Sequence, residues 1–123
     1  MGHDIYGAKS KSHFEEAILA GQYGDPTRYP WSRPAEFPYL RYSLGTYRSH
    51  EVYEMLGCTE LDGGVSGLGG GKTFSAFQLA AASRALECTR GEWPEWIQQQ
   101  EKEFFETMIR YAIEGGSAYI NFA

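Results

Sequence analysis

The spacing of apolar residues along the chain predicts four helices. After Pro94, the residues Ile97, Phe104, Met108 and Ala112 recur at helical intervals and place apolar side chains on one side. Shorter segments show the same period, and serines at capping-box spacing precede two of them. Glycines follow the segments as stop signals. The helices are expected over residues 12–20, 49–56, 76–88 and 94–114.

Alternation with a period of two predicts strands. Leu40 and Tyr42 would face one way, and Tyr39 and Arg41 the other. Helices and strands mix without a regular β-α-β order, which favours an α+β fold: a small antiparallel or mixed sheet with three to four helices packed on it. The last strand is expected to be paired, because an unprotected apolar edge invites aggregation. Strands are expected around Ile5 and Tyr6, over residues 39–44 and over residues 117–122.

Composition and charge indicate one domain, residues 1–123. Of the 123 residues 42% are hydrophobic, which is enough for a core, and the formal net charge is −5. This charge argues against a nucleic-acid polymer as partner, because such polymers attract basic surfaces. No apolar run is long enough to span a bilayer, and no secretion signal is recognisable. We therefore expect a soluble, cytoplasmic protein with no membrane partner and with Cys58 and Cys88 as reduced thiols.

A proline-rich segment over residues 21–38 connects the first helix to the next strand. It holds four of the five prolines, with Tyr23, Tyr29, Trp31 and Phe37 between them. Proline fixes its own backbone and restricts the preceding residue, so the segment should be extended and irregular. Its aromatic residues argue against disorder, and we expect it to lie over the domain surface with its rings partly buried.

A glycine-rich stretch, residues 63–73, is the most unusual local feature. Six of the nine residues from Gly63 to Gly71 are glycine, and Lys72 and Thr73 follow. Such a stretch carries few side chains and has a high entropic cost of ordering. The closing Gly-Lys-Thr resembles the end of a phosphate-binding P-loop, but Ser66 stands where that motif has its first glycine.

Three interpretations of this stretch stay open. The first is a true P-loop, although no apolar strand leads into it. The second is a looser anion site, in which backbone N–H groups of residues 69–72 and the start of the helix after Ser75 hold a phosphate. Lys72 would add charge there, and Thr73 or Ser75 a hydroxyl group. The third is a structural connection or a close crossover of the backbone.

A second constellation interleaves arginines with aromatic rings. Rings offer π faces and arginine a planar fork of donors, so together they can stack a base and hold a phosphate. The alternative is that the rings cover a small core while the arginines pair with the surplus acids. The members are Arg28, Trp31, Arg33, Arg41, Tyr42, Tyr47, Arg48 and His50.

No motif for metal binding or catalysis is present. The pairs His13 with Glu16 and His50 with Glu54 have one-turn spacing, but neither belongs to a metal-ligand motif. Nothing places a nucleophile beside a base. We therefore expect no enzyme activity, no metal and no cofactor. The acidic residues of the last helix predict a solvated face or a contact for a basic partner; they are Glu95, Glu101, Glu103 and Glu106.

Three short motifs resemble those of small phage and prophage proteins without assigned function. They are Met-Gly-His-Asp-Ile-Tyr-Gly at residues 1–7, Arg-Tyr-Ser-Leu-Gly at residues 41–45 and Gly-Val-Ser-Gly at residues 64–67. Together they cover under a fifth of the chain. The resemblance implies a viral or mobile-element origin and no particular activity.

The sequence therefore predicts a non-enzymatic protein that binds a small phosphorylated ligand. In a phage context this ligand would be a nucleotide signal of the host that the protein sequesters. The alternative is an acidic protein-interaction module or an inhibitor of a host protein complex. A homo-oligomer could form through the apolar C-terminal strand. The predicted ligand-binding residues are Gly69, Gly70, Gly71, Lys72, Thr73, Ser75, Trp31, Arg41, Tyr42 and Arg48.

Overall fold

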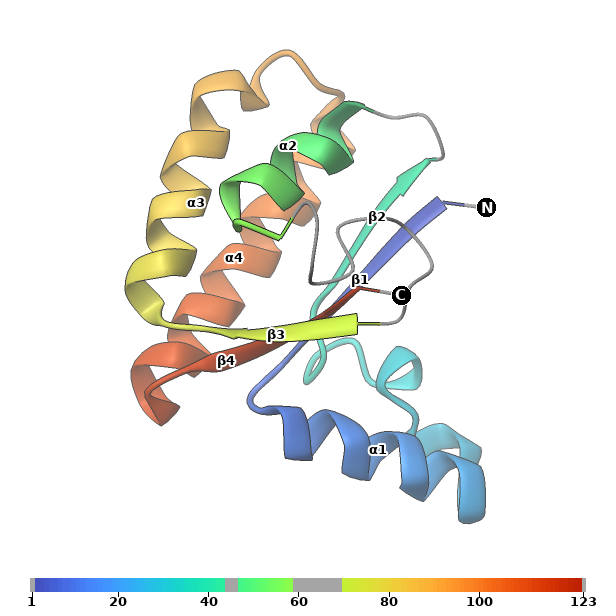
Figure 1. Cartoon of the computed structure of the whole chain (residues 1–123). Helices are drawn as coiled ribbons and strands as arrows, with labels where there is room; N and C mark the ends of the chain where they lie inside the picture. Colours follow the sequence, from blue (N-terminus) through green and yellow to red (C-terminus); the bar gives the residue numbers. More distant parts are fainter. Residues whose placement is uncertain (1, 44–46, 59–69, 123) are drawn as a thin grey trace.

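The computed structural model describes residues 2–43, 47–58 and 70–122. The chain forms a four-stranded antiparallel sheet in the order β2-β1-β4-β3, with four α-helices, as the α+β prediction requires (Figure 1). The strands are β1 (Gly2–Ala8), β2 (Tyr39–Ser43), β3 (Gly70–Phe74) and β4 (Ala118–Phe122). The helices are α1 (Lys11–Tyr23), α2 (Tyr47–Met55), α3 (Ala76–Arg90) and α4 (Glu95–Gly115), with short 3-10 turns η1 (Pro26–Arg28) and η2 (Pro30–Ser32).

The first and last strands occupy the centre of the sheet. In β1, Ile5 pairs with Leu40 of β2 on one side and with Phe122 of β4 on the other. β4 also pairs with β3, so both of its edges are used within the chain. The prediction that the last strand is paired is confirmed. The same pairing leaves β4 no edge for a second copy, so an oligomer cannot form through this strand as expected from the sequence.

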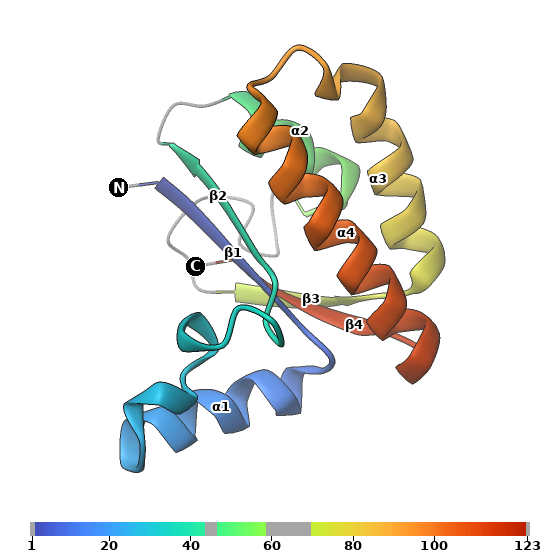
Figure 2. The same cartoon turned by 180° about the vertical axis from the view of Figure 1, so that it is seen from behind.

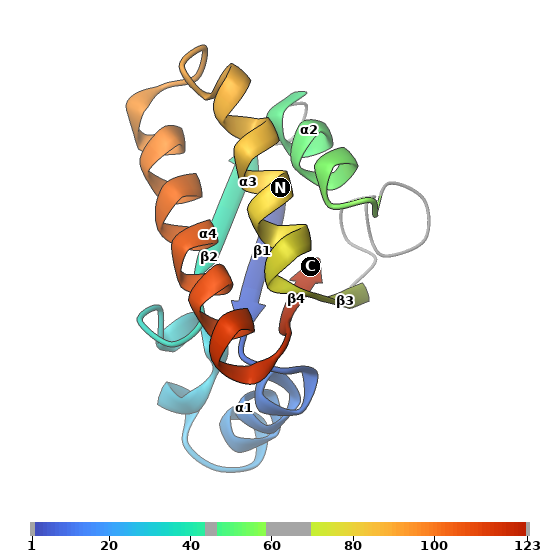
Figure 3. The same ribbon diagram turned by 90° about the vertical axis from the view of Figure 1, so that its left-hand side faces the viewer.

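The two faces of the sheet have different covers. Helices α2, α3 and α4 lie on one face, where Ile5, Leu40, Ile120 and Phe122 are fully buried against them (Figures 2 and 3). The opposite face meets α1 and the proline-rich segment through a smaller cluster. Its buried members are Ala8, Phe14, Ala17, Phe37 and Tyr119. The alternation predicted for residues 39–42 is confirmed, because Leu40 and Tyr42 belong to the helix-covered core.

The helix ends follow local hydrogen bonding. Helix α1 begins at Lys11, one residue earlier than expected, because the Ser10 hydroxyl accepts from the His13 N–H at 3.0 Å and serves as the cap in place of Ser12. It also continues past Gly21, which lies buried against the Tyr29 ring. The capping box predicted at Ser75 is confirmed. Helix α4 stops before Gly116, whose φ of 87° suits glycine.

Strand β3 is the main departure from the sequence prediction. Residues 70–73 were expected in a loop, but they are extended and pair with β4, with Lys72 opposite Ile120. The reason is tertiary pairing, since β4 offers a row of backbone groups that outweighs the weak strand preference of glycine. A Cβ on Gly71 would overlap the Tyr119 hydroxyl, so glycine also makes room for that ring. Residues 59–69 lie outside the described residues.

The helices contain no segment suited to the bilayer. Among the described residues, none of them combines the length and apolar character that a membrane crossing needs.

Candidate functional site

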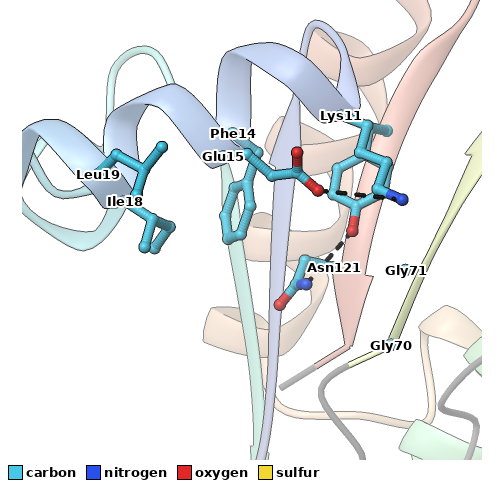
Figure 4. A pocket seen from close by; sticks show the side chains of 9 residues that line it. Lys11, Phe14, Glu15, Ile18, Leu19, Gly70, Gly71 and Asn121 are labelled. Atoms are coloured by element: carbon cyan, nitrogen blue, oxygen red, sulfur yellow. Dashed lines mark hydrogen bonds and ion pairs between the residues drawn. The ribbon is translucent and has the colours of Figure 1, made fainter.

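A groove lies between α1 and the strands β3 and β4 (Figure 4). Its volume of about 590 Å³ is in the usual range for ligand-binding clefts. In Figure 4 the Lys11 side chain of α1 lies nearest to Gly71, and Ile18 and Leu19 lie farther along the helix. The lining residues are Lys11, Phe14, Glu15, Ile18, Leu19, Gly70, Gly71, Tyr119 and Asn121.

The groove exists because one wall has almost no side chains. Gly70 and Gly71 present bare backbone, and the Tyr119 ring lies against Gly71. The facing wall is apolar: Phe14 is buried, Ile18 is half-buried and Leu19 is 53% exposed. Leu19 therefore contributes exposed apolar surface to the groove.

A few polar groups stand among these apolar residues. Lys11 Nζ lies 3.9 Å from Glu15 Oε1, one turn further along the exposed side of α1. The Asn121 side chain donates to the Tyr119 hydroxyl at 3.4 Å. The groove therefore offers a cation, a carboxylate and an amide around an apolar floor, which suits an amphipathic ligand.

The two outer edges of the sheet are treated differently. At β2 the side chain of Gln100 accepts from the Arg41 N–H at 3.2 Å and donates to the Arg41 carbonyl at 3.0 Å. The Gln100 amide thus occupies the backbone N–H and C=O groups of Arg41 that an added strand would bind. The antiparallel alternation directs the N–H and C=O groups of Gly71 and Thr73 away from β4. In the described part of the chain no residue pairs with these groups.

Two of the predicted ligand-binding residues belong instead to a buried polar network. Arg48 and Glu101 are both 0% exposed, and two guanidinium nitrogens of Arg48 bind the two oxygens of Glu101 at 2.6 and 2.7 Å. Tyr42 donates to Glu101 at 2.8 Å, and Arg90 Nε donates at 3.1 Å. Burial, and then the negative charge of Glu101, raise the pKa of Tyr42. This network joins β2, α2, α3 and α4, so it acts inside the domain.

The prediction that the acidic residues of the last helix form a solvated face is wrong at one position. Glu101 is wholly buried, whereas Glu95, Glu103 and Glu106 are exposed as expected. It stands four residues after Ile97 on the buried side of α4, and the arginines compensate its charge.

The remaining predicted residues are dispersed. Arg41 pairs with Asp4 at 3.1 Å, and Trp31 stacks on Tyr29 with ring centres 4.4 Å apart. Lys72 points to the helix-covered face, with Nζ 6.0 Å from the Phe74 ring centre. The Ser75 hydroxyl accepts from Gln78 N–H, and Thr73 is exposed on the edge of β3.

The structure therefore does not gather the predicted set around one ligand. Of its members Gly70 and Gly71 line the groove, and Gly69 lies outside the described residues. Sequence reasoning missed the α1 wall. The available signal was the adjacent pair Ile18 and Leu19, which makes the apolar side of α1 wider than the buried cluster requires.

Comparison with protein-family models, with curated proteins and with solved structures finds no match to this chain. Among the described residues, no cluster of three or more histidine, cysteine or acidic side chains is placed to hold a metal ion.

Proposed function

We propose that the chain is a protein-interaction module that binds an extended peptide segment along the outer edge of β3. One observation carries this proposal: the N–H and C=O groups of Gly71 and Thr73 point outward along the edge of β3, and Gly71 also lines the groove. An extended segment can add to such an edge as a further strand, with main-chain hydrogen bonds for affinity and side-chain pockets for specificity.

The groove supplies the side-chain pockets in this arrangement. Residues paired across a sheet share a face, so segment residues opposite Gly71 and Thr73 would point toward α1. Apolar side chains at these alternate positions would contact Ile18, Leu19 and Tyr119. Lys11 and Glu15 also line the groove, so polar residues at one end of the bound segment would contact their charged groups.

The partner is a different protein rather than a second copy of this chain. If two copies of β3 paired symmetrically about their middle residue, Lys72 would stand directly opposite its own counterpart. Like charges in directly opposed positions destabilise a strand pair. The acidic balance of the chain, −5, adds a preference for a basic partner.

A pair of substitutions at one position tests the proposal. Peptides selected from a random displayed library would be titrated into the ¹⁵N-labelled protein, with the amide signals of Gly71 and Thr73 as the readout. Thr73→Pro removes an outward N–H without removing a bond to β4, and it should abolish binding. Thr73→Val keeps the N–H and should bind as the wild type does. Equal binding by the proline and valine variants would overturn the proposal.

A small phosphorylated ligand remains a second proposal for the same groove. The volume of about 590 Å³ and the cation of Lys11 support it, and such a ligand could be a host nucleotide sequestered in the cytoplasm by a phage-encoded protein. Calorimetric titration with mono-, di- and cyclic nucleotides tests it: Lys11→Ala should weaken binding, whereas Lys72→Ala, on the other face of the sheet, should not. No heat with any nucleotide would exclude this ligand class.

A further inference from the structure

The face of the sheet that carries α1 has a second hollow, at the β2 side. We call it the aromatic hollow; it is lined by Tyr6, Pro30, Trp31, Pro34, Phe37 and Tyr39 and has a volume of about 170 Å³. A larger hollow of about 450 Å³ shares Pro34 and Tyr39 with it and extends to Phe104 and Glu103 of α4. In Figure 2 the segment that connects α1 to β2 lies beside the lower end of β2. The two hollows adjoin at Pro34 and Tyr39, which line both of them.

The rings around the aromatic hollow are held in fixed positions. Tyr6 stacks on Tyr39 with ring centres 4.8 Å apart, and the Tyr39 hydroxyl donates to Asp4. Trp31 stacks on Tyr29 and lies 6.3 Å from the Tyr6 ring. The backbone around them is tied down as well, because the Tyr111 hydroxyl donates to the Glu36 carbonyl at 2.7 Å and Gly7 N–H donates to Pro38 at 2.8 Å. A preformed site of this kind loses little entropy on binding.

From these observations we infer that the two hollows bind a proline-rich segment in the polyproline II conformation with a flanking arginine or lysine. Such segments dock in aromatic-lined grooves, and their conformation is ordered before binding. Their backbone carbonyls have no internal hydrogen bonds and need donors. Trp31 is 52% exposed, and its indole N–H forms no hydrogen bond with any described residue, so it can supply one.

Charge favours a basic flank on the partner. Glu103 is exposed on the rim of the larger hollow, where the Gln99 amide donates to it at 2.9 Å. Two nearby cations are engaged, because Arg41 pairs with Asp4 and Arg33 pairs with Glu36. A nucleobase could also stack on these rings, but among the described residues neither hollow is lined by an arginine or a lysine that would hold its phosphate. The observations therefore favour the peptide over a nucleotide.

Titration with defined probes tests this inference. The probe is the peptide Ala-Pro-Pro-Ala-Pro-Pro-Ala-Pro-Pro-Arg, compared with the same peptide in which alanine replaces every proline. Saturable shifts of the Trp31 indole N–H signal are expected with the first peptide and not with the second. Trp31→Ala should weaken binding about tenfold or more, since an aromatic contact and a hydrogen bond are lost. Trp96→Ala removes a tryptophan of similar exposure on α4 and should leave binding unchanged.

Two further variants separate the alternatives. Glu103→Lys should weaken binding of the arginine probe, whereas Glu106→Lys on the same helix should not. Thr73→Pro should have no effect, so this site and the β3 edge can fail independently. Equal binding of the two peptides, or no saturable binding to the wild type, would overturn the inference. Binding of adenosine at the Trp31 signal without binding of the peptide would also overturn it.

Discussion

Arg48 of α2 and Glu101 of α4 form a bidentate ion pair that is entirely closed to solvent. Their two contacts, at 2.6 and 2.7 Å, connect residues more than fifty positions apart in the chain. The same guanidinium also donates to the Thr89 hydroxyl at 2.7 Å and to the Leu86 carbonyl at 3.0 Å. Because Glu101, Thr89 and Leu86 all lie outside α2, which carries Arg48, these contacts fix how three helices meet above the sheet.

Replacing Glu101 by glutamine should therefore destabilise the domain strongly. The substitution keeps the volume but removes the buried charge that Arg48 and Arg90 share, leaving them, among the described residues, only longer contacts with the carboxylates of Glu51 at 3.3 Å and Glu87 at 3.7 Å. Breaking a buried pair in this way costs about 3–5 kcal/mol. Urea unfolding followed by circular dichroism measures the change. Glu103→Gln, at an exposed position of the same helix, should change the free energy of unfolding by less than about 0.5 kcal/mol. Similar losses for both variants would show that the buried pair contributes no more than a surface charge.

Stability should fall at alkaline pH because of a buried tyrosine. Burial, and then the charge of Cys58, raise the pKa of the Tyr53 hydroxyl from 10.0 to about 12. The unfolded chain then loses the proton at lower pH than the folded one, so the contribution is constant below pH 10 and is lost between pH 10 and about 12. The loss amounts to about 3 kcal/mol. Unfolding curves over this pH range measure it, and Tyr53→Phe should show a shallower decline; identical pH profiles would contradict the assignment.

The space above Gly71 should accept no side chain while Tyr119 keeps its hydroxyl. Gly71→Ala places a methyl group where the hydroxyl lies, and overpacking of this kind costs about 1–3 kcal/mol. Tyr119→Phe removes the nearest overlapping atom but leaves two ring carbons in close contact, so the double variant should recover only part of the lost stability. A double-mutant cycle on thermal unfolding measures this coupling. Purely additive effects would show that the two residues do not meet in solution.

Removing the cap of the β2 edge should promote self-association. Gln100→Ala exposes the N–H and C=O groups of Arg41, and an uncovered edge pairs with other chains. Light scattering after gel filtration should show larger species that increase with concentration. Gln99→Ala, which removes an exposed amide bound to Glu103, should leave the distribution unchanged. Equal behaviour of the two variants would show that Gln100 does not protect the edge.

Periodicity was enough to predict most of the fold. The pattern around Phe104 and Met108 reports burial directly, and the alternation of Leu40 and Tyr42 gives the orientation of β2. Strand β3 could not be predicted in this way, because its glycines have weak local preference and its conformation depends on pairing with β4. The resemblance of the glycine-rich stretch to phosphate-binding loops favoured a loop over a strand at the same residues.

The candidate site was harder to predict than the fold. Residue type suggested that Tyr42 and Arg48 contact a ligand. An arginine can also be buried when an acidic residue pairs with it, and Glu101 pairs with Arg48 here. The sequence contains this acid on the apolar side of a helix, four residues after Ile97. Reading that position as buried, rather than as part of a charged surface, would have paired it with the arginines.

The central position of β4 has a consequence for how the protein is made. Ile5 pairs with Phe122, so the middle of the sheet joins residues that leave the ribosome more than a hundred positions apart. Until β4 has been synthesised, β1 can pair with β2 alone, and β3 has no neighbour. The sheet can therefore be completed only after β4 has been synthesised. A copy that ends before residue 118 would keep its helical hairpin but would expose the unpaired edges of β1 and β3.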